Sequence, residues 1–254
     1  MAGFHERSLR LLPKVPEISE AAVAKVAEVE ARIGRPLPAA VRDWYVREDA
    51  CDILRTYSNE DPPVALEDLG RPIPASNSNP RDLAADGLLY IRTENQGVCA
   101  WAVLLDDRDD PEVAVSYDDL NEWQPQADTF SDYILSGIWD WGLVMPSEWL
   151  IQAQNGPLSE EALGHLRQHF RETVRTYGWP SDDQYRFEGD GLRLLLWSVA
   201  GGQTDWWLAA DDELRLAEAA RKIWLLDDVG KAFWSHKKKS DAALDRIAAE
   251  MATR

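Results

Sequence analysis

The stretch at residues 94–141, ENQGVCAWAVLLDDRDDPEVAVSYDDLNEWQPQADTFSDYILSGIWDW, decides the fold. Residues 98–105 are apolar at both alternating sets of positions, which is typical of a central strand. The segment DDRDDP predicts a hairpin loop, and residues 112–116 predict the returning strand. Thr129 is a favourable N-cap residue with Asp132 three positions later, so a helix is expected to begin there.

Two helices are predicted before this stretch. Ser19 is a good N-cap for the first helix, and Gly34 is placed to end it. Pro38 fits the first turn of a second helix, predicted over residues 39–54 from the helical spacing of its apolar side chains. Residues 57–87 are rich in turn formers and are predicted to form a loop.

The C-terminal part repeats the combination of helices and strands. Ser159 is predicted to cap a long helix over residues 160–177. The Gly-Asp-Gly sequence at 189–191 predicts a tight turn between two strands. Asp212 and Ser240 are predicted to cap two further helices.

These patterns predict three segments. Residues 1–18 contain Pro13 and Pro16, which disfavour a helix, and are expected to form a loosely attached N-terminal leader. Residues 19–145 are expected to form one domain, and residues 146–254 a helix-hairpin-helix lobe packed on it. The predicted fold class is α+β, with a mostly antiparallel sheet flanked by helices and a C-terminal α/β extension.

The charge is unevenly distributed. The 254 residues carry a formal net charge of −18, and residues 101–150 alone contain 12 acidic side chains against the single basic residue Arg108. Such a field repels nucleic acid and anionic membranes and attracts basic partners. Solubility alone is an alternative explanation for the acidic composition. The concentration of the charge favours a surface for a protein partner.

Composition also bears on location and packing. No run of 18 apolar residues occurs, and the first residues lack the apolar core of a signal peptide. With only Cys51 and Cys99, a disulfide framework is excluded and a cytoplasmic location is expected. Most of the 12 tryptophans are expected in the core, and the remainder are candidate interface anchors.

A search for catalytic chemistry identifies no reaction. His165 and His169 share a predicted helix face, but HLRQH lacks the glutamate of the metalloprotease motif and a third ligand. The carboxylates of DDRDDPE lack the glycine and the final glutamate of a calcium loop. No nucleophile elbow, phosphate loop or dinucleotide glycine pattern occurs. We therefore expect a protein that is not an enzyme and needs no cofactor or metal; an enzyme with a hidden site is the less favoured alternative.

Three blocks of sequence resemble the SUKH superfamily, which is named after the fungal cell-wall-synthesis regulators Smi and Knr. The blocks are VEARIGRPLPAAVRDWY at 29–45, ENQGVCAWAV at 94–103 and TFSDYIL at 129–135. The resemblance implies an α+β fold and a binding role. Bacterial members of the superfamily are mostly immunity proteins that bind a polymorphic toxin, often a nuclease, and others act as regulators or scaffolds.

The resemblance and the charge together predict a function. A toxin that acts on nucleic acid presents a basic cleft, which an acidic surface can occlude. We expect a cytoplasmic immunity protein that binds a basic toxin domain, with a regulatory or scaffold module as the alternative. No nucleic-acid or membrane partner is expected. The candidate partner-binding residues lie in or just after the hairpin loop: Asp106, Asp107, Asp109, Asp110, Glu112, Asp118, Asp119, Glu122 and Trp123.

Overall fold

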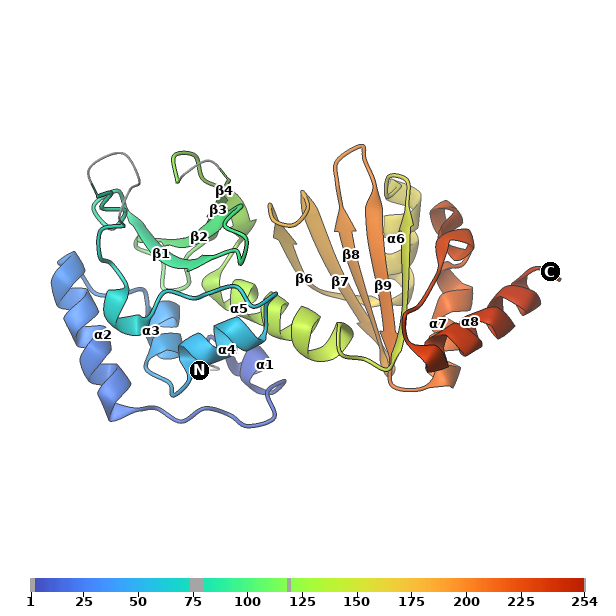
Figure 1. The fold of residues 1–254 in the computed structure, drawn as a ribbon, viewed down its shortest axis with the longest axis horizontal. Helices are drawn as coiled ribbons and strands as arrows, with labels where there is room; N and C mark the ends of the chain where they lie inside the picture. The colour runs from blue at the N-terminus through green and yellow to red at the C-terminus, as the bar shows by residue number, and fades with distance from the viewer. Residues whose placement is uncertain (1–2, 74–79, 118–119, 254) are drawn as a thin grey trace. The chain divides into compact units, whose positions relative to one another are not determined.

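The computed structural model describes residues 3–73, 80–117 and 120–253. The chain divides into two units, Met1–Trp139 and Asp140–Arg254 (Figure 1). Each unit has an antiparallel sheet flanked by helices, which confirms the predicted α+β fold class. The boundary lies before Asp140 and not after residue 145, because the Asp140 carboxylate pairs with Arg186 of the second unit.

The sheet of the first unit has the order β1-β2-β3-β4, and each neighbouring pair is antiparallel. Its strands are β1 (Leu88–Thr93), β2 (Ala100–Leu104), β3 (Val113–Ser116) and β4 (Gln124–Ala127). The helical elements are α1 (Glu6–Leu9), α2 (Glu20–Ile33), α3 (Ala39–Tyr45), α4 (Ala50–Thr56), the 3-10 turn η1 (Leu66–Asp68) and α5 (Phe130–Trp139). All four residues of β3 and four of five in β2 are buried, so the predicted central hairpin is confirmed.

The predicted single helix over residues 39–54 is wrong. The structure has α3 and α4 instead, and Asp49 between them adopts a left-handed backbone conformation with φ of 55°. A left-handed residue cannot continue an α-helix, so the chain changes direction there. The ends predicted for α2 are confirmed, because the Ser19 hydroxyl accepts a hydrogen bond from the Ala22 N–H and Gly34 is left-handed.

The N-terminal segment is not a loosely attached leader. His5 is completely buried, and its Nε2 donates to the Ala40 carbonyl oxygen at 2.8 Å. The imidazole also packs edge-on against the rings of Trp44 and Phe130, with centroid distances of 5.1 and 5.7 Å. Pro13 and Pro16 led to the wrong prediction, because the buried side chain that attaches this segment, His5, precedes them.

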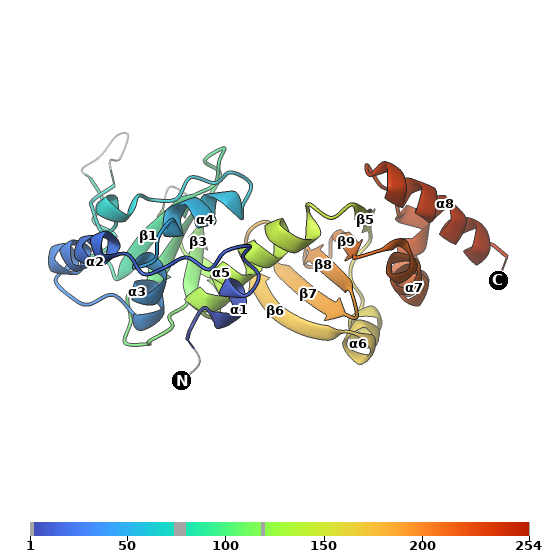
Figure 2. The same ribbon diagram turned by 90° about the horizontal axis from the view of Figure 1, so that it is seen from below.

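The second unit has a five-stranded sheet with the order β5-β9-β8-β7-β6, in which each neighbouring pair is antiparallel (Figure 2). Its strands are β5 (Trp149–Asn155), β6 (Arg171–Tyr177), β7 (Asp183–Gly189), β8 (Leu192–Ser198) and β9 (Thr204–Ala210). The helical elements are the π-helical turn η2 (Asp140–Val144), α6 (Glu160–His169), α7 (Glu213–Ile223), the 3-10 segment η3 (Leu226–Ala232) and α8 (Lys238–Met251). The second unit therefore has more strands and helices than the predicted helix-hairpin-helix lobe.

Two further expectations for this unit are corrected. The helix capped by Ser159 ends at His169, and RETVRTY forms strand β6, because its backbone pairs with β7. Ser240 lies inside α8 and is not its cap. The Ser240 hydroxyl instead bonds to the backbone of β5, accepting from the Leu150 N–H and donating to the Glu148 carbonyl oxygen.

The core of the second unit lies between one face of its sheet and the three α-helices. Alternate strand residues point to opposite faces, so Trp206 is completely buried in this core while Trp207 points to the other face. Helices α6, α7 and α8 lie on the core side of the sheet (Figure 2).

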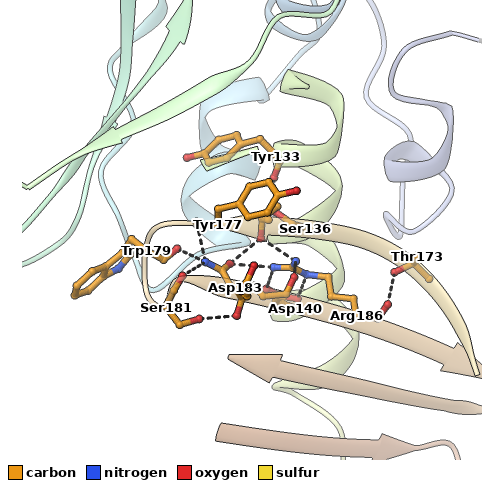
Figure 3. A network of polar contacts seen from close by, with 11 residues as sticks. Tyr133, Ser136, Asp140, Thr173, Tyr177, Trp179, Ser181, Asp183 and Arg186 are labelled. Atoms are coloured by element: carbon orange, nitrogen blue, oxygen red, sulfur yellow. Dashed lines mark hydrogen bonds and ion pairs between the residues drawn. The ribbon is translucent and has the colours of Figure 1, made fainter. Parts of the chain in front are cut away.

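A buried ion pair joins η2 to the sheet (Figure 3). The Arg186 guanidinium donates to both carboxylate oxygens of Asp140, each at 2.7 Å, and to the Thr176 hydroxyl at 2.9 Å. The side chains of Arg186 and Asp140 are 1% and 7% exposed. Two charges removed from water need this bidentate geometry to compensate for their lost hydration.

Removing one charge of this pair is expected to be costly. The variant Arg186→Met leaves the Asp140 carboxylate buried without its partner, and the free energy of unfolding should fall by about 3–5 kcal/mol. The double variant Arg186→Met with Asp140→Leu should recover most of that loss. Urea unfolding followed by circular dichroism measures both. Arg193→Met, at the more exposed pair with Asp211, is the control and should cost less than about 1 kcal/mol.

The burial of His5 predicts a pH dependence of stability. Burial lowers the pKa of His5 below the ordinary value of 6.5. Below pH 6.5 the unfolded chain therefore binds more protons than the folded one, and stability falls as the pH falls. His5→Gln retains the donor to Ala40 but does not titrate, so it should lose less stability than the wild type between pH 7.5 and 5.5. Equal losses in urea unfolding would show that His5 does not contribute.

Candidate functional site

The acidic loop between β2 and β3 is the predicted partner surface, and much of its charge is paired within the unit. The Asp106 carboxylate accepts hydrogen bonds from the Arg108 backbone N–H at 3.0 Å and from its Nε at 2.6 Å. Glu112 lies 3.8 Å from the same guanidinium. Arg108 therefore partly neutralises both Asp106 and Glu112.

A second arginine, which sequence proximity did not reveal, also reaches the loop. Arg35 follows α2 and donates to the carbonyl oxygens of Leu105 at 2.6 Å and Asp106 at 3.2 Å. Its guanidinium lies 3.6 Å from the Asp107 carboxylate. Arg35 therefore holds the start of the loop through the backbone and partly offsets its negative charge.

The Asp110 carboxylate is hydrogen-bonded within the first unit. Its carboxylate accepts hydrogen bonds from the Ser131 N–H at 3.0 Å and from the Ser131 hydroxyl at 2.5 Å. The Thr129 hydroxyl accepts from the Asp132 N–H at 3.1 Å, which confirms the predicted cap. Together these groups satisfy free donors in the first turn of α5. Asp110 was predicted to contact a partner, but its carboxylate stabilises the start of this helix.

Asp107 and Asp109 are the acids that the loop leaves exposed. Only the backbone of Asp109 is used for anchoring, because its carbonyl oxygen accepts from the Ala40 N–H at 2.8 Å. The loop is thus fixed to the N-terminal turn of α3 while both carboxylates face solvent. A rigid loop with exposed carboxylates loses little conformational entropy when a basic surface binds it.

The remaining predicted residues follow β3. Asp118 and Asp119 lie outside the described residues. Glu122 is exposed, and Trp123 is half-buried with its indole N–H donating to the Leu120 carbonyl oxygen at 3.1 Å. This bond holds the ring at the turn into β4, which lies at the other end of β3 from the acidic loop. Val113, next to the acidic loop, pairs with Ala127, whereas Gln124, next to Trp123, pairs with Val115. The prediction that Glu122 and Trp123 share one surface with the loop acids is therefore wrong.

The Asn-Gln-Gly block builds the turn between β1 and β2. The Glu94 carboxylate accepts from the Gln96 N–H at 2.7 Å. The Asn95 N–H donates to the Asp61 carboxylate at 3.1 Å, and the Asn95 side-chain amide donates to the Asn59 carbonyl oxygen. This block therefore attaches the segment after α4 to the sheet, which is a structural role.

A buried arginine lies beneath this turn. The Arg92 guanidinium stacks on Trp101 and Tyr133, with 4.6 and 5.0 Å to the ring centroids, and donates to the Leu54 carbonyl oxygen at 3.2 Å. Trp101 is 2% exposed and donates to the Gln126 side chain at 3.1 Å. Trp101 is therefore a core residue that packs the sheet.

Burial raises the pKa of two thiols and one phenol of the first unit, those of Cys51, Cys99 and Tyr45. A surface cavity of about 720 Å³ is lined by parts of α2, α4 and η1 and includes Cys51 and Tyr45. Burial raises the pKa of Cys51 to about 11 and that of Cys99 to about 12, so both thiols are protonated at neutral pH. Burial also raises the pKa of Tyr45 well above its ordinary value.

The part of the chain that the structure describes contains no cluster of side chains suited to bind a metal ion. No group of three or more His, Cys, Asp and Glu side chains there could hold an ion. The rings of His165 and His169 stack with centroids 4.1 Å apart, and the Nδ1 of His169 bonds to the His165 carbonyl oxygen at 2.9 Å. Within the same described ranges, no helix has both the length and the apolar character needed to cross a membrane.

Comparison with protein-family models, curated proteins and solved structures gave no match.

The two neighbouring acids of the loop are expected to differ in their effect on stability. Asp110→Ala removes acceptors from the first turn of α5 and should lower the free energy of unfolding by about 1–2 kcal/mol. Asp109→Ala removes only an exposed carboxylate and should change it by less than about 0.5 kcal/mol. Urea unfolding of the two variants tests this directly. Equal effects would contradict the helix-capping role of Asp110.

Proposed function

We propose that the protein is a binding protein of the SUKH type. The three sequence blocks that resemble this superfamily all fall in the first unit, where they contribute to α2, α3, the β1–β2 turn and α5. Two of them supply anchoring contacts, through the Ala40 N–H and the Asn95 amide. The blocks thus contribute to the helices, strands and turns of the unit, as expected for residues that characterise a fold.

Within that class, we propose an immunity protein that occludes a basic toxin domain without turnover. The observation that carries this proposal is the fixed acidic loop, with Asp107 and Asp109 exposed on a backbone held by α3 and Arg35. Electrostatic attraction speeds the encounter with a basic surface and gives specificity. A loop that is already ordered is suited to blocking a cleft.

The unactivated side chains support a role without catalysis. An enzyme that uses a thiol or phenol nucleophile lowers the pKa of that group. Burial instead raises the pKa of Cys51 and Tyr45. Binding by surface complementarity does not require an activated group.

Co-expression tests the proposal. An immunity protein is expected to be encoded beside its toxin, so the product of the neighbouring gene is produced with and without this protein, and growth is measured. Wild-type protein should restore growth, and the variant Asp107→Lys with Asp109→Lys should restore it less. For the purified pair, the association rate constant at low salt should fall roughly tenfold in this variant.

The matched control is Glu17→Lys with Glu28→Lys, which makes the same change in net charge at two exposed acids outside the loop. It should rescue growth like the wild type. Absence of rescue by the wild-type protein would contradict the immunity role and favour the regulatory or scaffold alternative. Equal loss in both double variants would show that net charge matters and the loop does not.

A further inference from the structure

The sheet of the second unit has a second, aromatic face. The strand register places Trp207 opposite both Leu195 and Gln152, and the backbone of Gln152 pairs with that of Trp234 through two 2.8 Å hydrogen bonds. Side chains of paired residues lie on the same side of a sheet. Two residues further along each of these strands, the same face carries a second row of paired side chains: Trp197, Asp205 and Gln154. We name these six side chains the tryptophan face: Gln152, Gln154, Trp197, Asp205, Trp207 and Trp234.

This face is accessible on the β5 side of the sheet. Trp207 and Trp197 are half-buried, and Trp234 is 40% exposed. The alternating residues, such as Trp206, point into the core with the helices. Three tryptophans therefore gather on the side of the sheet opposite α6, α7 and α8, without being needed to fill the core on the helical side.

Two of the three tryptophan rings pack against each other next to Asp205, whose backbone pairs with that of Trp197. The Trp197 and Trp207 rings have centroids 4.3 Å apart and planes tilted by 58°, so they present aromatic surface in two directions. Trp234 packs edge-on against His236, with 4.4 Å between ring centroids. The negative faces of indole rings attract cations, and tryptophan does so more strongly than tyrosine or phenylalanine.

Asp205 lies in this aromatic setting without a cationic partner among the described residues. It is half-buried, and its carboxylate accepts from the Gln154 side-chain amide at 2.7 Å. Burial is the cause that raises its pKa. Other acids of the unit are paired with arginines: Asp140 with Arg186, Asp183 with Arg175, Asp211 with Arg193, and Glu188 with Arg171. Asp205 is thus a carboxylate whose charge a ligand could compensate.

We propose that the tryptophan face binds an arginine side chain presented by a protein partner. The planar guanidinium can stack on an indole ring while its N–H groups donate to the Asp205 carboxylate. The glutamine carbonyl oxygens offer further acceptors on the same face. A neutral sugar could also stack on tryptophan, but it would leave the half-buried carboxylate uncompensated, so a cation fits better. This site belongs to the second unit and does not depend on the proposed immunity role.

The test uses the full chain and a defined probe. Isothermal titration calorimetry measures binding of the peptide acetyl-GRGRGRG-amide and of the same peptide with citrulline, the neutral isostere, in place of arginine. The arginine peptide should bind at least several-fold more tightly. Asp205→Asn and Trp207→Leu should each weaken it roughly tenfold. Circular dichroism and thermal unfolding of both variants verify that they are folded.

Two controls separate this site from general attraction to an acidic protein. Asp190→Asn makes the same chemical change at an exposed turn of the second unit, and Asp107→Lys with Asp109→Lys changes only the acidic loop. Both should retain most of the affinity for the arginine peptide. Equal binding of the arginine and citrulline peptides would overturn the proposal, as would equal weakening by Asp190→Asn and Asp205→Asn. Because no toxin is used, failure here leaves the growth-rescue result unaffected.

Discussion

The backbone of Ala40 is the constraint on which the first unit depends. Its N–H is one of the free donors at the start of α3, and it donates to the Asp109 carbonyl oxygen in the acidic loop. Its carbonyl oxygen accepts from the buried His5 imidazole. The backbone of one residue therefore connects the N-terminal segment, a helix and the loop. A loop fixed in this way can keep its carboxylates exposed without collapsing onto its own backbone.

Charge pairing differs between the two surfaces that we propose for binding. In the acidic loop, Arg108 and Arg35 offset part of the negative charge, and two exposed carboxylates remain available. On the tryptophan face a single half-buried carboxylate lies among aromatic rings. The first arrangement suits long-range attraction of a basic surface. The second suits recognition of one cationic group, since a partly buried carboxylate interacts more strongly with a nearby cation than a fully exposed one does.

The elements with strong local signals were predictable. Apolar continuity identified β2, and the turn residues identified the hairpins after β2 and β7. Caps at Ser19, Thr129, Ser159 and Asp212 were correct because an N-cap bond joins residues only two or three apart. The predictions failed where distant partners decide. RETVRTY is a strand because β7 lies beside it, and Asp110 caps a helix that begins 20 residues later in the chain.

The sequence by itself determined the α+β class, the central hairpin and the position of the acidic loop, because each rests on patterns within a few residues. Only the tertiary structure decided which loop acids are exposed, because Arg35 and Ser131 reach the loop from elsewhere in the chain. The tertiary structure also decided which of the neighbouring residues Trp206 and Trp207 is buried in the core. Adjacent strand residues point to opposite faces of the sheet. Because α6, α7 and α8 pack on the face to which Trp206 points, Trp206 is a core residue, whereas Trp207 lies on the face that we propose for binding.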